Sequence, residues 1–294
     1  MALLHLLVIF VTSSSAICYV PVVFWHGFAN AYTVKSIEEI KYNLHQIYPE
    51  MYVKVLEIGN TVMDDFVNSV MMHPDKQIEI ACGSVLADPN LKDGYIGVGF
   101  SQGGLLLRGL AQRCPQPRMI KLITMGSMHQ GVYGLPHCGL QHIICRMIRS
   151  VYDRLMYMNF FQNHYVPATY WHNPSNPEEY KLKNSFLTDI NNENFINKTY
   201  IKNLNALDKF VLVRYTNENF VVPAVSEWFG YFKEDALTVT DTMEDAEMFI
   251  NDRLGLNRMY QEGKLEFLTV PWDHVEFHWD WFKDNIVDKY LTQK

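Results

Sequence analysis

Apolar positions along the chain follow two spacings that alternate from one segment to the next. Runs with the length and composition of β-strands are found at residues 19–25, 51–59, 95–100, 119–126, 209–215 and 265–270. Helical spacing, with apolar residues three or four positions apart, is found at about 34–48, 61–72, 76–87, 102–113 and 277–291. This alternation predicts an α/β fold with a mostly parallel, buried central sheet and helices on both of its faces.

One long segment, at about residues 130–205, breaks the alternation between two predicted strands. It is rich in Tyr, Phe, His, Met and Asn, and it contains helical patches and several prolines. An insertion between sheet strands is a common place for a substrate-binding cap. The sequence therefore predicts a single α/β domain over residues 17–294, with an inserted helical cap.

The first 16 residues are typical of a secretory signal peptide. Their apolar stretch, residues 3–11, is too short to span a bilayer as a helix, and Ser14, Ser15 and Ala16 offer the small residues that a signal peptidase needs. An N-terminal core strand is the alternative. No later apolar run is long enough for a transmembrane helix, so the mature chain is expected to be lysosomal or secreted.

Cysteine usage agrees with export to an oxidising compartment. The fifth cysteine, Cys18, lies beside the predicted cleavage site, and the other four form an even set suited to disulfides: Cys82, Cys114, Cys138 and Cys145. A metal site is the alternative, but there is no C-x-x-C pattern and the histidines do not cluster near these cysteines. Neither a metal nor an organic cofactor is expected. A glycosylation sequon begins at Asn197.

The charge of the chain narrows the classes of partner. The net charge is −7, from 25 basic and 32 acidic residues, and no run of like charge is present. This balance argues against a nucleic acid or an anionic membrane surface as the main partner.

The stretch GFSQGG, residues 99–104, has the form G-x-S-x-G and joins a predicted strand to a predicted helix. A nucleophile elbow needs this context, because the serine is held in a strained turn and flanking glycines avoid clashes with the neighbouring strand and helix. The helix start adds N–H groups and a positive dipole end. A serine that only caps the helix is the alternative. The pattern favours Ser101 as a nucleophile.

A serine nucleophile needs a base, which in an α/β-hydrolase comes last in the chain. His274, in the loop after the last predicted strand, is at the right place. His278 is expected on the terminal helix as a surface or packing residue. The spacing of these two histidines also suits a helical zinc site, but the H-E-x-x-H pattern and a third ligand are missing.

The serine also needs donors for the developing oxyanion. His26 and Gly27 follow the first predicted strand, and the backbone there can turn so that the N–H of Phe28 points at the oxyanion. The N–H of Gln102, the residue after the serine, is the expected second donor. A simple turn at the strand end is the alternative for His26 and Gly27.

These residues resemble the palmitoyl-protein thioesterases, from about Val22 to the C-terminus. The motifs that carry the resemblance are GFSQGGLLLRGLAQRCPQP, HQGVYGLPHC, YWHNP, LTDIN, SEWFGYF and NDRLGL. The resemblance implies an α/β-hydrolase that cleaves the thioester between a cysteine and a long fatty acyl chain. Its substrates would be S-palmitoylated proteins or peptides and fatty acyl thioesters such as acyl-CoA. It implies Ser101 as nucleophile, His274 as base, and the N–H groups of Phe28 and Gln102 as oxyanion donors.

The resemblance further implies two disulfides and a glycan. It pairs Cys82 with Cys114 and Cys138 with Cys145. It also makes Asn197 a glycosylation site.

The sequence departs from the family pattern at the catalytic acid. The family has an aspartate directly before the proline that precedes SEWFG, and here Val222 stands at that position. The paired cysteines that the family has after the first strand are also missing, with Asn30 and Ala31 near that place.

Three interpretations of Val222 remain open. Glu218 lies four residues earlier, just past a strand, and its longer side chain could reach His274. Asp273 adjoins the histidine, but it is expected to point away. In the third interpretation no acid serves the histidine, which in serine proteases costs about 10⁴ in turnover. Weakened but real hydrolysis is the favoured expectation.

Three functions therefore compete. The first is hydrolysis of long-chain acyl thioesters, and the second is a lipase or carboxylesterase activity on the same fold. The third is an inactive homologue that binds lipid. Residues 154–171 and 228–232 offer apolar material for an acyl groove, although most of them are expected to fill the core of the cap.

Overall fold

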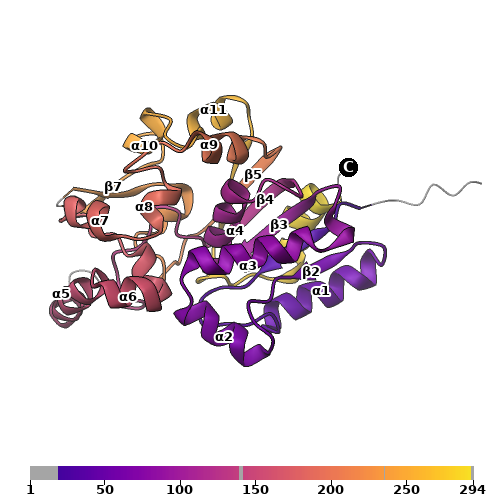
Figure 1. The fold of residues 1–294 in the computed structure, drawn as a ribbon, viewed down its shortest axis with the longest axis horizontal. Helices are drawn as coiled ribbons and strands as arrows, with labels where there is room; N and C mark the ends of the chain where they lie inside the picture. The colour runs from indigo at the N-terminus through magenta and orange to yellow at the C-terminus, as the bar shows by residue number, and fades with distance from the viewer. Residues whose placement is uncertain (1–18, 139–141, 235, 293–294) are drawn as a thin grey trace, which may run out of the picture.

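A computed structural model describes residues 19–138, 142–234 and 236–292 (Figure 1). Neighbouring strands of its six-stranded sheet are all parallel, in the order β2-β1-β3-β4-β5-β8. The strands are β1 (Val22–Trp25), β2 (Val53–Val55), β3 (Tyr95–Phe100), β4 (Met119–Met125), β5 (Lys209–Tyr215) and β8 (Leu265–Val270). The predicted α/β-hydrolase fold, with its parallel sheet, is confirmed. The predicted signal peptide lies outside the described residues.

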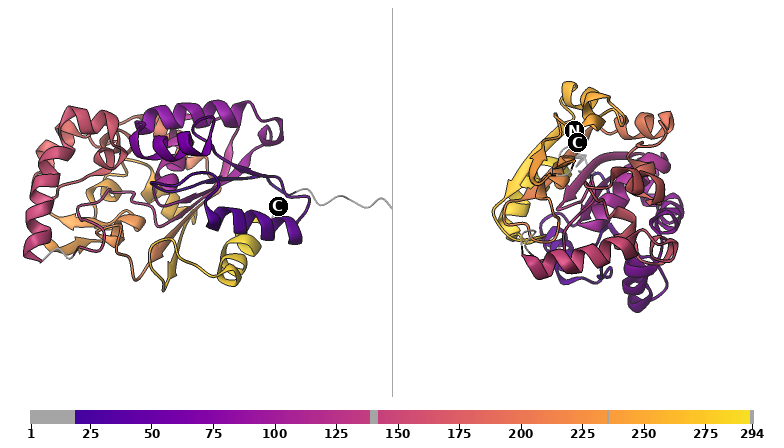
Figure 2. Two further views of the ribbon diagram at one scale, coloured as in Figure 1. Left: turned by 90° about the horizontal axis from the view of Figure 1, so that it is seen from below. Right: turned by 90° about the vertical axis from the view of Figure 1, so that its left-hand side faces the viewer.

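Helices cover both faces of this sheet, as Figure 2 shows. One face carries α1 (Lys35–Ile47) and the C-terminal segments α12 (Trp279–Phe282) and η4 (Lys283–Leu291), which is wound as a π-helix; the other carries α2 (Val62–Met71), α3 (Pro74–Leu86) and α4 (Gln102–Arg113). The alternation of side chains along β1 explains the two layers. Val22 and Phe24 join the core beside α1, whereas Val23 and Trp25 join the core beside α4.

The chain between β4 and β5 builds most of a second lobe over one end of the sheet (Figure 1). Its helical elements are α5 (Ile143–Met156), α6 (Asn159–His164), η2 (Val166–Tyr170), α7 (Pro177–Lys183), α8 (Leu187–Ile190) and α9 (Lys198–Asn205). The predicted cap insertion at about 130–205 falls on this segment. Among the described residues, no helix is long and apolar enough to cross a bilayer.

A second insertion, between β5 and β8, packs onto the first. It contains η3 (Ala224–Trp228), the antiparallel hairpin of β6 (Tyr231–Lys233) and β7 (Ala236–Asp241), α10 (Glu247–Ile250) and α11 (Leu256–Gln261). The ring of Tyr231 stacks on His172 with centroids 4.1 Å apart, and its hydroxyl donates to the carbonyl of His172. Arg253 also accepts, through its carbonyl, a 2.8 Å hydrogen bond from Asn192. The cap is therefore built from both insertions, whereas the sequence pattern predicted a single cap insertion at about residues 130–205.

A buried guanidinium ties α4 to this cap. Arg108 has no solvent exposure, and it donates to the carbonyls of Ile190 and His129 and to Oδ1 of Asn191, the last at 2.8 Å. Burial lowers the pKa of Arg108 to about 9, so it still carries its charge at neutral pH. The helix that follows Ser101 is thus fixed to the cap by three hydrogen bonds from one side chain.

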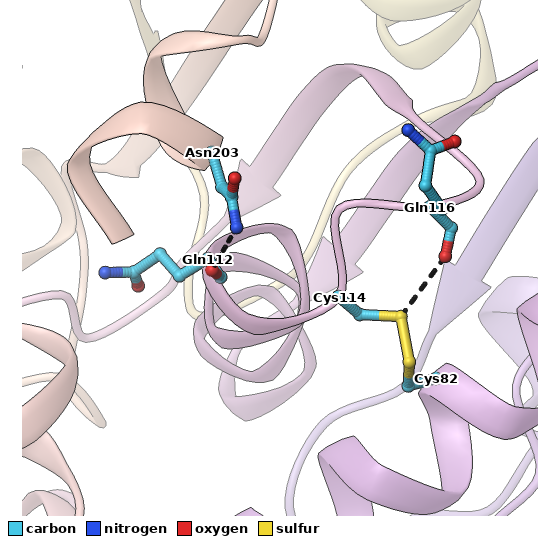
Figure 3. Close-up of a disulfide and its surroundings, with 5 residues drawn as sticks. All are labelled: Cys82, Gln112, Cys114, Gln116 and Asn203. Carbon is cyan, nitrogen blue, oxygen red and sulfur yellow. Dashed lines mark hydrogen bonds between the residues drawn. A yellow bond between two sulfur atoms is a disulfide. The ribbon is translucent and has the colours of Figure 1, made fainter. Parts of the chain in front are cut away.

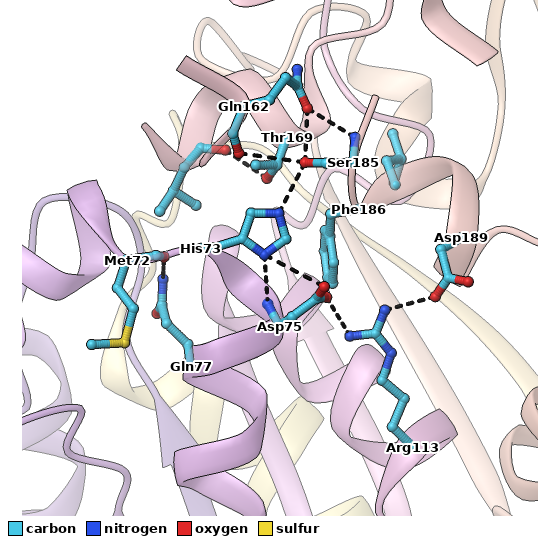
Figure 4. A network of polar contacts seen from close by, with 12 residues as sticks. Met72, His73, Asp75, Gln77, Arg113, Gln162, Thr169, Ser185, Phe186 and Asp189 are labelled. Carbon is cyan, nitrogen blue, oxygen red and sulfur yellow. Dashed lines mark hydrogen bonds and ion pairs between the residues drawn. The ribbon is translucent and has the colours of Figure 1, made fainter. Parts of the chain in front are cut away.

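Figure 4 shows a polar network that joins the start of α3 to the cap. The imidazole of His73 lies 2.9 Å from the hydroxyl of Ser185. Arg113, at the end of α4, bridges the carboxylates of Asp75 and Asp189 at 2.5 and 2.7 Å. Because Asp75 belongs to α3 and Asp189 to α8, the network holds the sheet domain and the cap together.

Two disulfides are present among the described residues. Cys82 pairs with Cys114, so the end of α3 is linked to the end of α4, and Cys138 pairs with Cys145 at the start of α5. Figure 3 shows the first bridge beside the contact of α9 with α4, in which Asn203 donates to the carbonyl of Gln112 at 2.8 Å. The Cys82–Cys114 bridge and the contact of Asn203 both hold the C-terminal end of α4, the helix that follows Ser101.

The two bridges are expected to stabilise the fold unequally. Cys82 and Cys114 are 32 residues apart, and Cys138 and Cys145 are 7 apart. Loop-closure entropy then gives about 3.5 kcal/mol for the first and about 2.5 kcal/mol for the second. Replacing Cys82 and Cys114 by serine should therefore lower the free energy of unfolding in urea more than replacing Cys138 and Cys145. Equal losses would contradict the chain-entropy account.

Candidate active site

Ser101 occupies the sharp turn between β3 and α4. Its backbone has φ 52° and ψ −123°, a conformation that is costly for a residue with a side chain. Two neighbouring glycines make the turn possible. A Cβ atom on Gly99 would collide with the backbone of Gly104, and one on Gly103 would collide with the carbonyls of β1 and the loop after it. The hydroxyl is thereby presented at the end of the sheet, as a nucleophile elbow requires.

The imidazole of His274 connects this serine to a carboxylate. Its Nε2 lies 2.8 Å from Oγ of Ser101, and its Nδ1 lies 2.6 Å from Oε2 of Glu218. His274 comes from the loop after β8, and Glu218 comes from the loop after β5, which is the neighbouring strand. A serine, a base and an acid from three separate loops therefore form one hydrogen-bonded chain.

The carboxylate of Glu218 is held in place by its own loop. Its Oε1 accepts hydrogen bonds from the backbone N–H groups of Phe220 at 2.6 Å and Val221 at 2.9 Å. This leaves Oε2 for the imidazole, and the side chain is fully buried. Burial alone would raise the pKa of Glu218, but hydrogen bonds with His274 and with Glu227 outweigh it and lower this pKa to about 2. Glu218 is therefore ionised at mildly acidic and at neutral pH.

A second buried carboxyl group, that of Glu227 in η3, lies against Glu218. One oxygen or nitrogen atom from each of Glu218, Glu227 and His274 lies within 4.8 Å of the other two. The N–H of Tyr215 donates to Oε2 of Glu227 at 2.8 Å, whereas Oε1 of Glu227 has no hydrogen-bond donor in the described structure. Burial raises the pKa of Glu227 well above its ordinary value, and the hydrogen bond and charge of Glu218 raise it further. The raised pKa favours the neutral carboxylic acid form of Glu227, which can donate a hydrogen bond to the ionised Glu218 beside it.

The predicted oxyanion donors lie beside the serine. A Cβ atom on Gly27 would lie 3.2 Å from Cβ of Ser101, so the loop that carries Phe28 passes directly over the nucleophile. Gln102 is the first residue of α4, and the first N–H groups of a helix have no carbonyl partner within it. Both N–H groups therefore belong to the immediate surroundings of Oγ.

Helix α2 contacts the loop of Phe28 and the side chain of Gln102, the two predicted donor residues, which the sequence did not reveal. The carboxylate of Asp65 is fully buried, and it contacts Nε2 of His26 at 2.9 Å and accepts from the N–H of Tyr32 at 2.7 Å, on either side of Phe28. The carbonyl of Ser69, one turn further on, accepts from the side chain of Gln102 at 2.8 Å. A sequence signal exists, because Asp65 and Ser69 put two polar residues on the inward face of an amphipathic helix.

Two cavities meet at Ser101, and they share the side chains of Phe28 and Phe220. The larger, about 380 Å³, extends past His26, Asn30 and Ile37 towards α1. The smaller, about 140 Å³, extends into the cap, and its wall is almost entirely apolar and aromatic: Met128, Val132, Leu135, Pro136, Tyr152, Tyr165, Pro167, Tyr170 and Trp171. The serine hydroxyl therefore has a different environment on each side.

Comparison with known proteins places the chain among thioesterases. The sequence profile of the family described as "Palmitoyl protein thioesterase" matches residues 21–274. The chain is 37% identical over 273 residues to Palmitoyl-protein thioesterase 1 of Caenorhabditis elegans, with 92% of each protein covered. The chain belongs to the palmitoyl protein thioesterase family. This membership confirms the resemblance found in the sequence and makes the protein a thioester hydrolase by family.

More distant relatives were also found. Lysosomal thioesterase PPT2-B of Xenopus laevis is 26% identical over 298 residues, with 99% of this chain and 98% of that one covered. Among solved structures, a monoacylglycerol lipase of Paleococcus ferrophilus is 10% identical, with a TM-score of 0.44 and with 92% of this chain and 93% of that chain covered.

Within the palmitoyl protein thioesterase family, Val222 marks the position at which the resemblance implies an aspartate. Its side chain packs closely against Gly134, and its carbonyl accepts from the N–H of Tyr133 at 2.7 Å. Asp273 accepts a 2.8 Å hydrogen bond from the backbone N–H of His274 and does not contact the imidazole in the described structure. The imidazole nitrogen that an acid would serve is already paired with Glu218.

His278 directly precedes α12 and lies outside the site of this thioesterase. It makes an edge contact with Trp272, with ring centroids 4.7 Å apart. The described residues contain a different set with metal-ligand spacing, namely Glu218, Glu227 and His274. Oε2 of Glu218 pairs with the imidazole of His274 and Oε2 of Glu227 pairs with the N–H of Tyr215, so these two carboxylate oxygens already have partners within the described residues.

The buried proton on Glu227 predicts a pH-dependent effect of Glu227→Gln. The unfolded chain loses this proton near the ordinary pKa of 4.5, whereas the folded protein keeps it, so the wild type loses stability as the pH rises above about 4.5. The amide N–H of glutamine can donate a hydrogen bond to Glu218 as the carboxylic acid does, and it does not titrate. In urea unfolding, the free energy of unfolding of the variant should equal that of the wild type at pH 4 and exceed it at pH 7. A difference that does not change with pH would contradict a neutral Glu227.

Proposed function

We propose that this protein hydrolyses long-chain fatty acyl thioesters and thereby removes acyl groups such as palmitoyl from cysteines of proteins or peptides. The observation that carries the proposal is the hydrogen-bonded chain from Ser101 through His274 to Glu218, at 2.8 and 2.6 Å. It lies where a small apolar cavity meets a larger one. Membership of the thioesterase family supports the thioester as the bond that is cleaved.

In the proposed first step, Oγ of Ser101 attacks the thioester carbonyl while Nε2 of His274 takes its proton. The charge that appears on the imidazole is stabilised by the carboxylate of Glu218, which also keeps the ring in the required tautomer. The carbonyl oxygen becomes an oxyanion between the N–H groups of Phe28 and Gln102, beside the positive end of α4.

In the second half of the reaction, the thiolate leaves and takes the proton from His274. Water, activated by the same histidine, then cleaves the acyl ester on Ser101 and releases the fatty acid. A thiolate leaves easily, because a thiol has a pKa of about 8.5. The proposed mechanism therefore needs no metal ion.

The two cavities suit the two parts of such a substrate. The apolar one inside the cap, which Tyr152 and Trp171 help to line, suits the start of the acyl chain. The larger one, beside Asn30 and Ser36, suits the cysteine and its attached polypeptide or carrier. The described structure thus supports an acyl chain that enters the cap and a leaving group that departs towards α1.

Glu218 supports a working enzyme rather than an inactive lipid-binding homologue. A glutamate side chain is one methylene longer than aspartate, and the N–H groups of Phe220 and Val221 orient it towards His274. We propose that it fully replaces the acid that Val222 cannot provide. Its pKa of about 2 keeps it ionised in acidic compartments as well as at neutral pH.

We further propose that the protein acts in the secretory pathway, either in lysosomes or outside the cell. Two disulfides favour an oxidising compartment. Asn197 is exposed at the start of α9, where a glycan can be attached without displacing core residues. One of the relatives is named a lysosomal thioesterase.

Substitutions at three positions test the proposed roles by palmitoyl-CoA hydrolysis. Ser101→Ala should lower turnover by about 10⁶, and Glu218→Gln by up to about 10⁴. Val222→Asp should not raise it, because Nδ1 of His274 is already occupied and Val222 packs against Gly134. Faster turnover in Val222→Asp would show that Glu218 is not the working acid.

A parallel assay tests which bond is cleaved. Hydrolysis of a matched oxygen ester at the same rate as the thioester would favour a lipase or carboxylesterase.

Glu227 should contribute by positioning Glu218. Glu227→Leu removes the donor to that carboxylate and is expected to lower kcat by about 10 to 100-fold with little change in KM. Glu227→Gln keeps the donor and should restore kcat to within about threefold of the wild type. Both variants should be compared by circular dichroism for correct folding. Equal losses in the two variants would contradict a role for the hydrogen bond.

A further inference from the structure

We propose that the outward face of α5 docks the protein on the surface of an anionic lipid bilayer, so that acyl chains reach the active site from the membrane. The inference rests on the proposed function, because it supplies a route for the substrate. It is carried by three observations: an exposed apolar face, its position beside the acyl cavity, and its local positive charge.

The exposed face of α5 is formed by five apolar side chains with helical spacing. Their exposed fractions are between 50% and 66%: Ile143, Ile144, Met147, Ile148 and Val151. At 100° per residue they cover an arc of about 140°, whereas Arg149 and Met156 on the opposite side are buried. Soluble proteins rarely expose such a continuous apolar strip without a partner.

The neighbouring helix extends this surface. Met158 precedes α6 and Phe160 lies in it, with exposed fractions of 51% and 62%. Helix α5 lies at the outer edge of the cap, and α6 lies beside it (Figure 1). We call these seven residues on α5 and α6 the apolar face.

The apolar face adjoins the cavity that is proposed for the acyl chain. Tyr152 on α5 and Tyr165 after α6 both line that cavity, and their hydroxyls form a 3.1 Å hydrogen bond. The same two helices therefore present apolar side chains to the outside and build the cavity wall on the inside. An acyl chain that leaves a bilayer against this face has a short path to Ser101.

Local charge favours an anionic bilayer as the partner. Residues 142–165 contain three arginines and one aspartate, although the whole chain has a net charge of −7. Arg146 and Arg154 are exposed beside the strip, whereas Asp153 is turned inward and accepts from Trp171 and Asn173 at 2.7 and 2.8 Å. Arginines that flank an exposed apolar face are typical of helices that lie in a membrane interface.

The same charges disfavour a second copy of the chain as the partner. A two-fold contact would bring the arginines of one α5 close to those of the other. Helix α2 provides the contrast, because it exposes Met63, Phe66 and Met71 beside Asp64 and contains no basic residue. Exposed apolar side chains combined with positive charge thus distinguish α5 from α2.

Vesicle co-sedimentation tests the proposal without turnover. The Ser101→Ala protein should sediment with vesicles of 30 mol% phosphatidylserine in phosphatidylcholine. Adding Ile144→Gln, Met147→Gln and Ile148→Gln should weaken this binding at least about tenfold, because three apolar contacts with the bilayer are lost. Glutamine is a good helix former, so α5 should remain helical in this variant. Arg146→Gln with Arg154→Gln should weaken it by about fivefold for each arginine on these vesicles and little on pure phosphatidylcholine.

A matched control replaces exposed apolar residues elsewhere. Leu182 and Phe195 are 82% and 86% exposed on another part of the cap, so Leu182→Gln with Phe195→Gln should leave vesicle binding unchanged. In the otherwise native protein, the α5 triple variant should hydrolyse soluble acyl thioesters normally but act more slowly on an S-palmitoyl peptide held in vesicles.

The outcomes separate this proposal from the proposed function. A protein that hydrolyses soluble thioesters but does not sediment with anionic vesicles would overturn the docking proposal alone. Vesicle binding through α5 without any hydrolysis would support the docking surface and overturn the thioesterase function. A dimer in light scattering that the α5 triple variant abolishes, with no vesicle binding, would assign the face to a second copy instead.

Discussion

The active site depends on a short hydrogen bond between two loops of neighbouring strands. The Glu218 carboxylate, in the loop after β5, holds the imidazole of His274, which follows β8, at 2.6 Å. Burial by itself would disfavour the ionised carboxylate. Two backbone N–H groups, the imidazole and the protonated Glu227 together offset that cost. The base is therefore oriented towards Ser101 only while several elements of the cap and the sheet stay packed around one charge.

Much of the sheet and the nucleophile could be predicted from local patterns. The apolar runs at 95–100 and 209–215 coincide with β3 and β5, because buried parallel strands are apolar on both faces. The glycines around Ser101 reflect a close crossing of β3 and α4, which leaves no room for a Cβ atom. Such constraints act over a few residues, and so they are visible in the sequence.

Contacts between distant segments were not visible in the same way. The sequence left the acid open between Glu218, Asp273 and none, because the reach of a side chain depends on how two loops meet. Asp65 supports the loop of Phe28 from a helix 37 residues further along, by direct contacts that no local spacing indicates. The cap also draws on residues 224–261, whose short hairpin carries a weak pattern. The net charge of −7 also gave no indication of the basic region on α5, because a total over the whole chain does not show where the charges lie.

The proposed acid at position 218, in place of the aspartate expected at position 222, has a consequence for how such proteins are recognised. A search that requires an aspartate before the proline would classify this chain among degenerate, non-catalytic relatives. Yet the imidazole needs only an oxygen of the right charge at the right point, and a longer side chain from an earlier residue of the same loop supplies it. Within this fold, the acid is better identified by its distance from the histidine than by its place in an alignment.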